Sequence, residues 1–284
     1  MFLILYNPIS RNGRNTKVVS KAIKRVSRDK DEKVYSKNLL EITNVEHFLQ
    51  TLEPNTKAVI VGGDGTLHRI ANALKNHDNL PPIYLFKAGT GNDFRRSIKK
   101  RGQLILINEY LNNIPSVFYT NQAGLEEEKK FLNCAGFGYD GLVCYNLDQA
   151  RTAKSHSNFF KITIGSLNQY RPTDLKVVVD GVEHNFKKAW LITAMNGQYF
   201  GGGMKGAPKA NRKDSDTQIL IVSNITKNKL LLLFPSIYLG FHPIFKKHVT
   251  ILKGREIIAE IDGQAYLQID GESGPAINKI RVVK

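Results

Sequence analysis

Cysteines are scarce in this sequence, and they show no metal-binding pattern. Its 284 residues include only two, Cys134 and Cys144, without CxxC spacing or a nearby histidine cluster. Neither a disulfide scaffold nor a zinc site is therefore expected, and a reducing cytoplasm fits this usage. The sequence also lacks a helix-turn-helix, zinc-finger or RNP-like signature, so we expect no nucleic-acid partner.

Long hydrophobic runs are missing as well. The apolar start FLILY is too short for a secretory signal and is broken by Asn7 and Pro8. The longest apolar run, residues 230–245, is interrupted by Pro235, Gly240 and Pro243 and falls short of the roughly 20 residues that a bilayer span needs. We expect this run to form a helix that is buried or interfacial.

Acidic residues are few compared with basic ones. The sequence has 41 lysines and arginines but only 25 aspartates and glutamates, which gives a net charge of +16. Such a surface attracts nucleic acid, nucleotide phosphates or an anionic membrane. Any single basic cluster is better explained as a solvated face, but their number favours an anionic partner. The 42% hydrophobic content indicates a soluble globular protein of one or two domains.

A glycine-rich turn at Gly62–Thr66 stands between an apolar strand and an amphipathic, helix-like segment. Its three glycines permit positive φ and close approach of an anion, and the first helical amides point outward. A carboxylate repels a neighbouring phosphate unless a cation lies between them. Asp64 is therefore interpreted as contacting the phosphate through Mg²⁺ or through water. A tight turn whose glycines only solve a packing problem is the alternative.

A second turn of this kind, residues 88–93, follows the apolar strand 83–86. Both turns belong to a βαβα rhythm that includes a strand at 2–6, a helix at 16–26, a weak strand near Val34 and a helix at 45–52 capped by Asn44. This rhythm predicts a parallel sheet covered on both faces. Ligands of such sheets bind outside the carboxyl ends of the strands, where both turns would lie.

After about residue 118 the rhythm changes to strands separated by turn signals, among them an Asp180–Gly181 hairpin turn. This pattern predicts a second, mainly antiparallel domain. The expected strands are 131–135, 175–180, 182–187, 190–195, 218–222, 249–252 and 257–261, with helices near 140–150, 158–168 and 229–239.

Six segments in order carry a family resemblance: NPIS at 7–10, GGDGT at 62–66, GTGNDF at 89–94, AGFGYDGLV at 135–143, YFGGGMKGAP at 199–208 and IDGE at 269–272. Together they resemble the diacylglycerol kinase catalytic family, which includes bacterial soluble diacylglycerol kinases, sphingosine kinases and ceramide kinases. The resemblance implies an NAD kinase/diacylglycerol kinase-like fold of class α/β plus β. Its Rossmann-like N-terminal domain would span 1–118 with a returning strand 276–284, its C-terminal β-sandwich 119–275, and ATP would lie in the cleft between them.

The resemblance also implies roles for individual residues. The nucleotide-binding positions would be Asn7, Ser10, Gly62, Gly63, Asp64, Gly65, Thr66 and Thr90. Asp270 matches the residue proposed as general base, with Glu272 beside it, and phosphoryl transfer does need a carboxylate that accepts the hydroxyl proton. The alternative is a solvated Asp-Gly turn, which is how we interpret Asp180–Gly181.

Four more aspartates match family positions. Asp214 and Asp216 lie where relatives bind a structural Mg²⁺, although Lys213 and Ser215 replace two residues of that segment. A hard cation would still find oxygen ligands there, and an exposed acidic loop is the alternative. Asp93 and Asp140 match positions on the acceptor side or positions that hold the cleft together, and each also suits a helix cap.

The predicted function is an ATP- and Mg²⁺-dependent kinase that phosphorylates the hydroxyl of a membrane lipid, diacylglycerol or a related alcohol. It would be cytoplasmic, peripheral to the inner face of an anionic membrane, and a homodimer is the ordinary expectation for an oligomer. An NAD kinase-like enzyme is one alternative. A nucleotide-responsive binding protein with little catalysis is another, because Arg11, Arg69 and the altered metal segment at Asp214 and Asp216 depart from the family pattern, as Lys87 also does.

Overall fold

The computed structural model describes residues 1–9, 16–27, 32–75, 79–88, 91–150 and 156–284. The chain divides into two compact units, Met1–Ile114 and Pro115–Lys284. The boundary expected at residue 118 falls inside strand β6 (Ser116–Thr120), which pairs with strands of the second unit. The division therefore comes slightly earlier in the chain than the sequence indicated.

The first unit contains a five-stranded sheet in the order β2-β1-β3-β4-β5. Four strands are parallel, and only β5 runs antiparallel to β4. The strands are β1 (Phe2–Tyr6), β2 (Val34–Asn38), β3 (Lys57–Gly62), β4 (Ile83–Lys87) and β5 (Leu104–Leu106). The helices are α1 (Thr16–Val26), α2 (Val45–Gln50), α3 (Asp64–Ala73), α4 (Asp93–Ile98) and α5 (Asn108–Leu111), with a 3-10 turn η1 (Leu39–Glu41).

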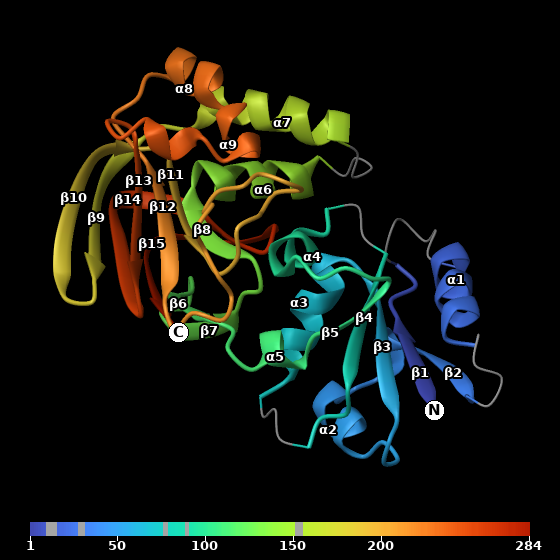
Figure 1. The fold of residues 1–284 in the computed structure, drawn as a ribbon. Coiled ribbons are helices and arrows are strands. Elements are labelled where there is room, and N and C mark those ends of the chain that lie inside the picture. Colours follow the sequence, from blue (N-terminus) through green and yellow to red (C-terminus); the bar gives the residue numbers. More distant parts are fainter. Residues whose placement is uncertain (10–15, 28–31, 76–78, 89–90, 151–155) are drawn as a thin grey trace. The chain divides into compact units, whose positions relative to one another are not determined.

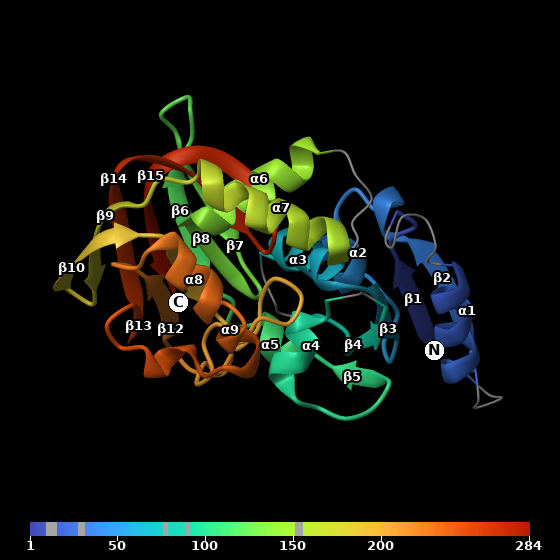
Figure 2. The same ribbon diagram turned by 90° about the horizontal axis from the view of Figure 1, so that it is seen from above.

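Helices cover both faces of this sheet, with α1 on one side and α3 on the other (Figures 1 and 2). The apolar side of α1 packs on strand residues that share one face, including Ile4, Val59 and Val61. Their neighbours along the strands, such as Leu5 and Ile60, point to the opposite face because side chains alternate along a strand. The predicted strand 2–6 and helix 16–26 are confirmed residue for residue.

The second unit is built on ten connected, antiparallel strands. Eight follow the order β13-β12-β11-β8-β14-β15-β6-β7, while β9 pairs with β10 and with β14. Besides β6, they are β7 (Glu126–Lys130), β8 (Cys134–Gly138), β9 (Thr173–Val179), β10 (Val182–Ala189), β11 (Leu191–Met195), β12 (Thr217–Val222), β13 (Val249–Gly254), β14 (Glu256–Ile269) and β15 (Glu272–Val283). The long β14 pairs with β9 through its first half and with β8 through its second.

Two expectations differ from the structure here. The last strand, β15, pairs with β14 and β6, so it belongs to the second unit and does not return to the first. The strand expected at 131–135 begins only at Cys134. The reason is local, because the Asp270 carboxylate accepts the backbone N–H groups of Leu132 and Asn133, which a ladder would otherwise use.

Helices of the second unit are α6 (Tyr139–Gln149), α7 (His156–Gln169), α8 (Lys227–Leu233) and α9 (Ser236–Leu239), with a 3-10 turn η2 (His242–Ile244). In both views α6 and α7 lie side by side at one end of the strands (Figures 1 and 2). The apolar run 230–245 forms two short helices separated at Pro235 rather than one. Within the described ranges, no helix is long and apolar enough to cross a membrane.

Candidate active site

The glycine-rich turn joins β3 to α3. Gly62 ends the strand, Gly63 is the N-cap, and Asp64 is the first helical residue. These glycines permit positive φ, but none of Gly62, Gly63 and Gly65 adopts it. Gly62 is required for space instead, because a Cβ there would lie 2.4 Å from the Thr66 Cβ. At Gly65 a Cβ would meet no atom within 4 Å among the described residues outside its own helix, so these residues leave room for a bulky group.

Asp64 connects the two glycine turns. Its Oδ2 accepts the N–H of Asp93 and its Oδ1 the N–H of Phe94, each at 3.0 Å. The turns after the neighbouring parallel strands β3 and β4 therefore meet at the carboxyl edge of the sheet, where the sequence placed them. The carboxylate sits in the first turn of α3 and thus has a favourable position in the helix dipole.

The other predicted nucleotide positions are placed only in part. Asn7 follows β1, and its Oδ1 accepts the N–H of Ile9 at 3.0 Å. Thr66 is buried in α3. Ser10 and Thr90, with the divergent Arg11, lie outside the described residues. Their nucleotide-binding roles stay predictions.

Asp93 opens α4 and is almost completely buried. Its carboxylate pairs with the Arg96 guanidinium, Oδ1 to Nη1, at 3.2 Å. No side-chain hydrogen bond caps the helix at Asn92, so the cap that the sequence allowed for Asp93 comes from Asp64. The divergent Arg69 lies on the exposed side of α3.

In the second unit, Asp270 lies in the tight turn between β14 and β15. Its backbone is left-handed, with φ +52°, and Gly271 follows at +86°. The carboxylate accepts three backbone N–H groups, from Leu132 at 2.6 Å, Asn133 at 2.7 Å and Cys134 at 3.1 Å. These charge-assisted bonds fix its position. Glu272, the first residue of β15, is exposed.

The Asp180–Gly181 turn has the same local geometry. Asp180 is also left-handed, with φ +47°. Its carboxylate accepts the N–H groups of Arg255 at 3.0 Å and Glu256 at 2.9 Å. What separates the two turns is therefore their surroundings and not their backbone.

A buried polar network adjoins the Asp270 turn. The Gln268 side chain accepts the N–H of Gly271 at 3.1 Å and donates to Asp140 Oδ2 at 3.0 Å. Thr193 Oγ1 donates to the same oxygen at 2.8 Å. Burial raises the pKa of Asp140 to about 6, and the hydrogen bonds from Thr193 and Gln268 limit the rise. Asp140 lies in the first turn of α6, so this network ties that helix to the turn.

Residues 132–134, whose N–H groups bind Asp270, are also fixed by hydrogen bonds to the Leu132 carbonyl. Arg212 is only 4% exposed, and its guanidinium donates to the Leu132 carbonyl. Asn196 donates to the same carbonyl at 3.1 Å and accepts from Lys284 Nζ at 2.8 Å. Burial lowers the pKa of Lys284 to about 8. Sequence reasoning missed these residues, since no motif marks them and burial of charge is visible only in the fold.

The structural Mg²⁺ that the resemblance implied at Asp214 and Asp216 stays a prediction, and in the structure both carboxylates contact a lysine. The Lys253 ammonium lies 3.1 Å from Asp214 Oδ2 and 3.2 Å from Asp216 Oδ2. Hydrogen bonding from Lys253 also lowers the pKa of Asp216. The cation that bonds these two carboxylates is thus a lysine of β13.

Two family models match the chain. The diacylglycerol kinase catalytic domain covers residues 1–114, and the YegS C-terminal NAD kinase beta sandwich-like domain covers 133–283. The chain belongs to the diacylglycerol kinase catalytic family. The fold class and the family expected from the six motifs are confirmed, and the protein is a lipid kinase.

Individual relatives agree with this assignment. A diacylglycerol kinase of Mycobacterium tuberculosis is 28% identical over 91% of this chain and 84% of its own length. A diacylglycerol kinase of Bacillus subtilis is 24% identical over 76% of this chain and 71% of its own. A solved structure of a Bacillus anthracis diacylglycerol kinase has a TM-score of 0.63 at 17% identity and covers 100% of this chain and 93% of that one. The last likeness bears on the fold alone.

Proposed function

We propose that the protein transfers the γ-phosphoryl group of ATP to the hydroxyl of a membrane lipid, diacylglycerol or a related lipid alcohol, at the cytoplasmic membrane surface. The observation that carries the proposal is the Asp64 carboxylate, which joins two glycine turns at the carboxyl edge of a parallel sheet. That edge is where open α/β sheets bind their ligands. The named activity of the relatives supports a lipid as acceptor.

In this proposal the first unit holds the nucleotide. The open backbone at Gly65 admits phosphate oxygens, and the early amides of α3 point toward them. A single carboxylate together with substrate phosphates is an ordinary donor set for Mg²⁺, so Asp64 fits the metal of a Mg–ATP complex. Bound Mg–ATP supplies the transferable phosphoryl group and neutralises part of its charge.

The second unit supplies the base. Asp270 accepts the proton of the lipid hydroxyl, whose oxygen then attacks the γ-phosphorus while the bond to the β,γ-bridging oxygen breaks. The three N–H groups of the 132–134 loop hold the carboxylate in one orientation, which lowers the entropy lost on reaching the reactive geometry. Gln268 ties the turn to Asp140 and restrains it from the other side.

The test compares Asp270→Asn with Asp180→Asn, using labelled ATP, Mg²⁺ and mixed micelles that contain a panel of lipid alcohols. Each variant replaces, by an amide, a carboxylate that accepts backbone N–H groups at a left-handed turn. We therefore expect both to lose a similar amount of stability. We expect kcat to fall at least about 100-fold in Asp270→Asn, as loss of a general base does, and to stay within about twofold in Asp180→Asn. Equal losses would make Asp270 a structural residue only.

The same assay separates the alternatives. NAD is added to the assay as a soluble acceptor. If NAD is phosphorylated and no lipid is labelled, the protein is an NAD kinase-like enzyme. ATP binding without transfer to any acceptor would favour a nucleotide-responsive binding protein.

A further inference from the structure

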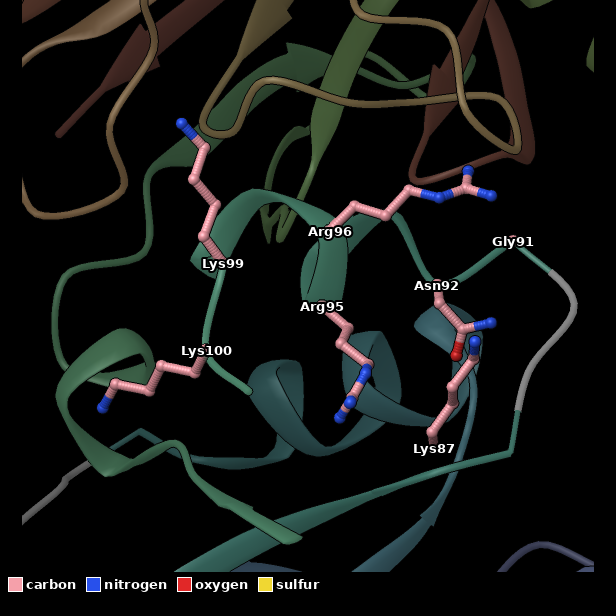
Figure 3. A pocket seen from close by; sticks show the side chains of 7 residues that line it. All are labelled: Lys87, Gly91, Asn92, Arg95, Arg96, Lys99 and Lys100. Carbon is pink, nitrogen blue, oxygen red and sulfur yellow. The ribbon is translucent and has the colours of Figure 1, made fainter. Parts of the chain in front are cut away.

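Arg212, in the loop before β12, is a buried cation, with only 4% of its surface exposed. Basic residues of the first unit contrast with it. Beside α4, Arg96, Lys99 and Lys100 are exposed, and in Figure 3 their charged ends extend in different directions. Burial removes the hydration of a guanidinium group, and its hydrogen bonds must offset that cost. The partners of Arg212 therefore show what its charge is used for.

The peptide group 132–133 connects Arg212 to the Asp270 carboxylate. The carbonyl of this peptide, on Leu132, accepts from the Arg212 guanidinium and, at 3.1 Å, from the Asn196 side chain. Its N–H, on Asn133, donates to Asp270 Oδ1 at 2.7 Å. The N–H and C=O of a trans peptide lie in one plane and point in opposite directions. Fixing the carbonyl therefore also aims the N–H at the carboxylate.

The next peptide group, 133–134, is held in the same way. Its N–H, on Cys134, donates to Asp270 Oδ1 at 3.1 Å, and its carbonyl accepts the backbone N–H of Asn196 at 3.0 Å. Arg212 also bonds the Asn133 side chain, Nη2 to Oδ1, at 2.5 Å. Arg212 and Asn196 thus fix two consecutive peptide groups whose N–H groups bind one carboxylate oxygen.

Lys284, which follows β15, fixes the direction of the Asn196 side chain. Its ammonium group donates to Asn196 Oδ1 at 2.8 Å and to the Arg212 carbonyl at 3.1 Å. An ammonium group has donors and no acceptor, so the amide oxygen of Asn196 faces Lys284. The amide NH₂ is then directed to the Leu132 carbonyl, as the structure shows.

The Asp180 turn uses a backbone donor at the matching position. Asp180 accepts the N–H groups of Arg255 and Glu256, and the carbonyl of the peptide 255–256 accepts the backbone N–H of Lys284 at 3.1 Å. A backbone N–H is neutral, whereas the guanidinium beside Asp270 is charged. A charged donor polarises the peptide more strongly and so strengthens the N–H bond on its other side. The carboxylate of Asp270 is therefore held more firmly than a turn of this kind requires.

We propose that Arg212 and Asn196 are positioning residues for Asp270, because they fix the two peptide groups that hold its carboxylate in the orientation that accepts the lipid proton. This inference rests on the proposed function, in which Asp270 is the general base. Both residues act through the backbone and not on the substrates. Their contribution therefore belongs to kcat rather than to KM.

The first test compares the kinetics of Arg212→Gln and Arg171→Gln in the lipid kinase assay. Arg171 is exposed in the same unit, and its guanidinium also donates to a backbone carbonyl, that of Asn168, at 3.1 Å. For Arg212→Gln we expect kcat to fall at least about tenfold and KM for ATP and lipid to stay within about threefold. Arg212→Lys keeps a charged donor and should lose less. A kcat of Arg212→Gln equal to that of Arg171→Gln would overturn the proposal.

Combination with Asp270→Asn distinguishes positioning from damage to the fold. Without a carboxylate to position, Arg212→Gln should change the remaining kcat less than about twofold. A damaged fold would instead lower kcat by the same factor in both backgrounds, and that outcome would contradict the proposal. If Arg212→Gln does not fold, Asn196→Ala takes the same tests with an expected loss of at least about threefold, because it removes one donor to the Leu132 carbonyl and leaves the guanidinium in place.

Amide hydrogen exchange followed by NMR tests the positioning without any substrate. In Arg212→Gln the amides of residues 133–134 should exchange at least about fivefold faster relative to those of residues 255–256 at the Asp180 turn. An unchanged ratio of the two rates would overturn the proposal. If the wild-type protein phosphorylates no lipid, the proposed function fails, whereas the exchange ratio still reports whether Arg212 fixes these peptide groups. The two failures are therefore distinguishable.

Discussion

Asp140 is a buried carboxyl group, and burial opposes its ionisation. Its Oδ2 accepts hydrogen bonds from Thr193 and Gln268, while its Oδ1 is buried and has no hydrogen-bond partner among the described residues. Desolvation is the larger effect and raises the pKa of Asp140 to about 6, well above the ordinary value for an aspartate. A carboxyl group with a raised pKa destabilises the folded state once it ionises, so Asp140 costs stability at neutral pH.

The pH dependence follows from that sign. Between pH 4 and 6 Asp140 binds more protons in the folded chain than in the unfolded one. Its contribution to the free energy of unfolding therefore falls as the pH rises, by up to about 3 kcal/mol in total. Asp140→Asn cannot ionise, and its stability relative to wild type should therefore increase by that amount from pH 4 to 7. Urea unfolding followed by fluorescence of Trp190, the single tryptophan, reports on the second unit.

The exposed Asp262→Asn variant is the control for this experiment, because it removes a carboxylate of the same unit without a buried partner. The test is whether the stability difference between Asp140→Asn and wild type changes with pH by more than the difference between Asp262→Asn and wild type. An equal change for both variants would mean that the Asp140 carboxylate is solvated in the folded protein.

The two Asp-Gly turns show what a sequence can predict at this scale. The dipeptide correctly indicated a turn at Asp180 and Asp270, because Asp tolerates the left-handed conformation and Gly favours it. It did not indicate that each carboxylate binds the backbone of another segment, since those partners lie 75 residues or more away along the chain. Such partners are decided by tertiary packing.

At the scale of elements, a lysine of β13 binds the loop before β12. Lys253 bonds Asp214 and Asp216, and these bonds raise the pKa of Lys253. The sequence marked the two acids as metal ligands from their position in the family. It did not show that β13 pairs beside β12 in the register that brings an ammonium group to them.

We therefore expect a chelator to leave the melting temperature of the wild-type protein unchanged. In Lys253→Gln the two carboxylates lose their shared cation, so the melting temperature should drop by a few degrees and recover on addition of Mg²⁺, whose preferred ligands are carboxylate oxygens. Differential scanning fluorimetry with EDTA and with Mg²⁺ measures both effects. Lys279→Gln, which breaks a similarly exposed pair with Glu260, should show no recovery.

A wild-type protein that loses stability in EDTA would contradict this account and would support a bound metal at the acidic loop.

The helices and strands were predicted far better than the contacts of this loop, because alternation and helical periodicity are local signals. Strand β1 and helix α1 agree with their predicted bounds. The family resemblance, and not the periodicity, placed a returning strand 276–284 in the first unit, whereas β15 pairs with β14 and β6 of the second.

At the scale of the whole molecule, the net charge of +16 attracts anionic surfaces, but charge alone does not hold a protein at a bilayer. The α8–α9 surface adds apolar contact. Leu232 is 77% exposed and Leu239 66% exposed, and the same stretch of sequence carries exposed lysines that include Lys229 and Lys246. We expected the apolar run 230–245 to be buried or interfacial, and these two leucines of the run face outward.

If the proposed membrane action is right, these leucines enter the lipid interface. Leu232→Ser/Leu239→Ser should then weaken binding to phosphatidylglycerol vesicles at least about tenfold, because burying even part of two leucine side chains is worth more than 1.4 kcal/mol. Val182→Ser is the matched control, since Val182 is 59% exposed at the β9–β10 turn. Co-sedimentation at low and high salt separates the apolar share, which persists in salt, from the electrostatic share, which is screened. Equal binding of both variants at high salt would leave attraction by charge as the whole of the membrane affinity, and the exposed leucines would then have another partner.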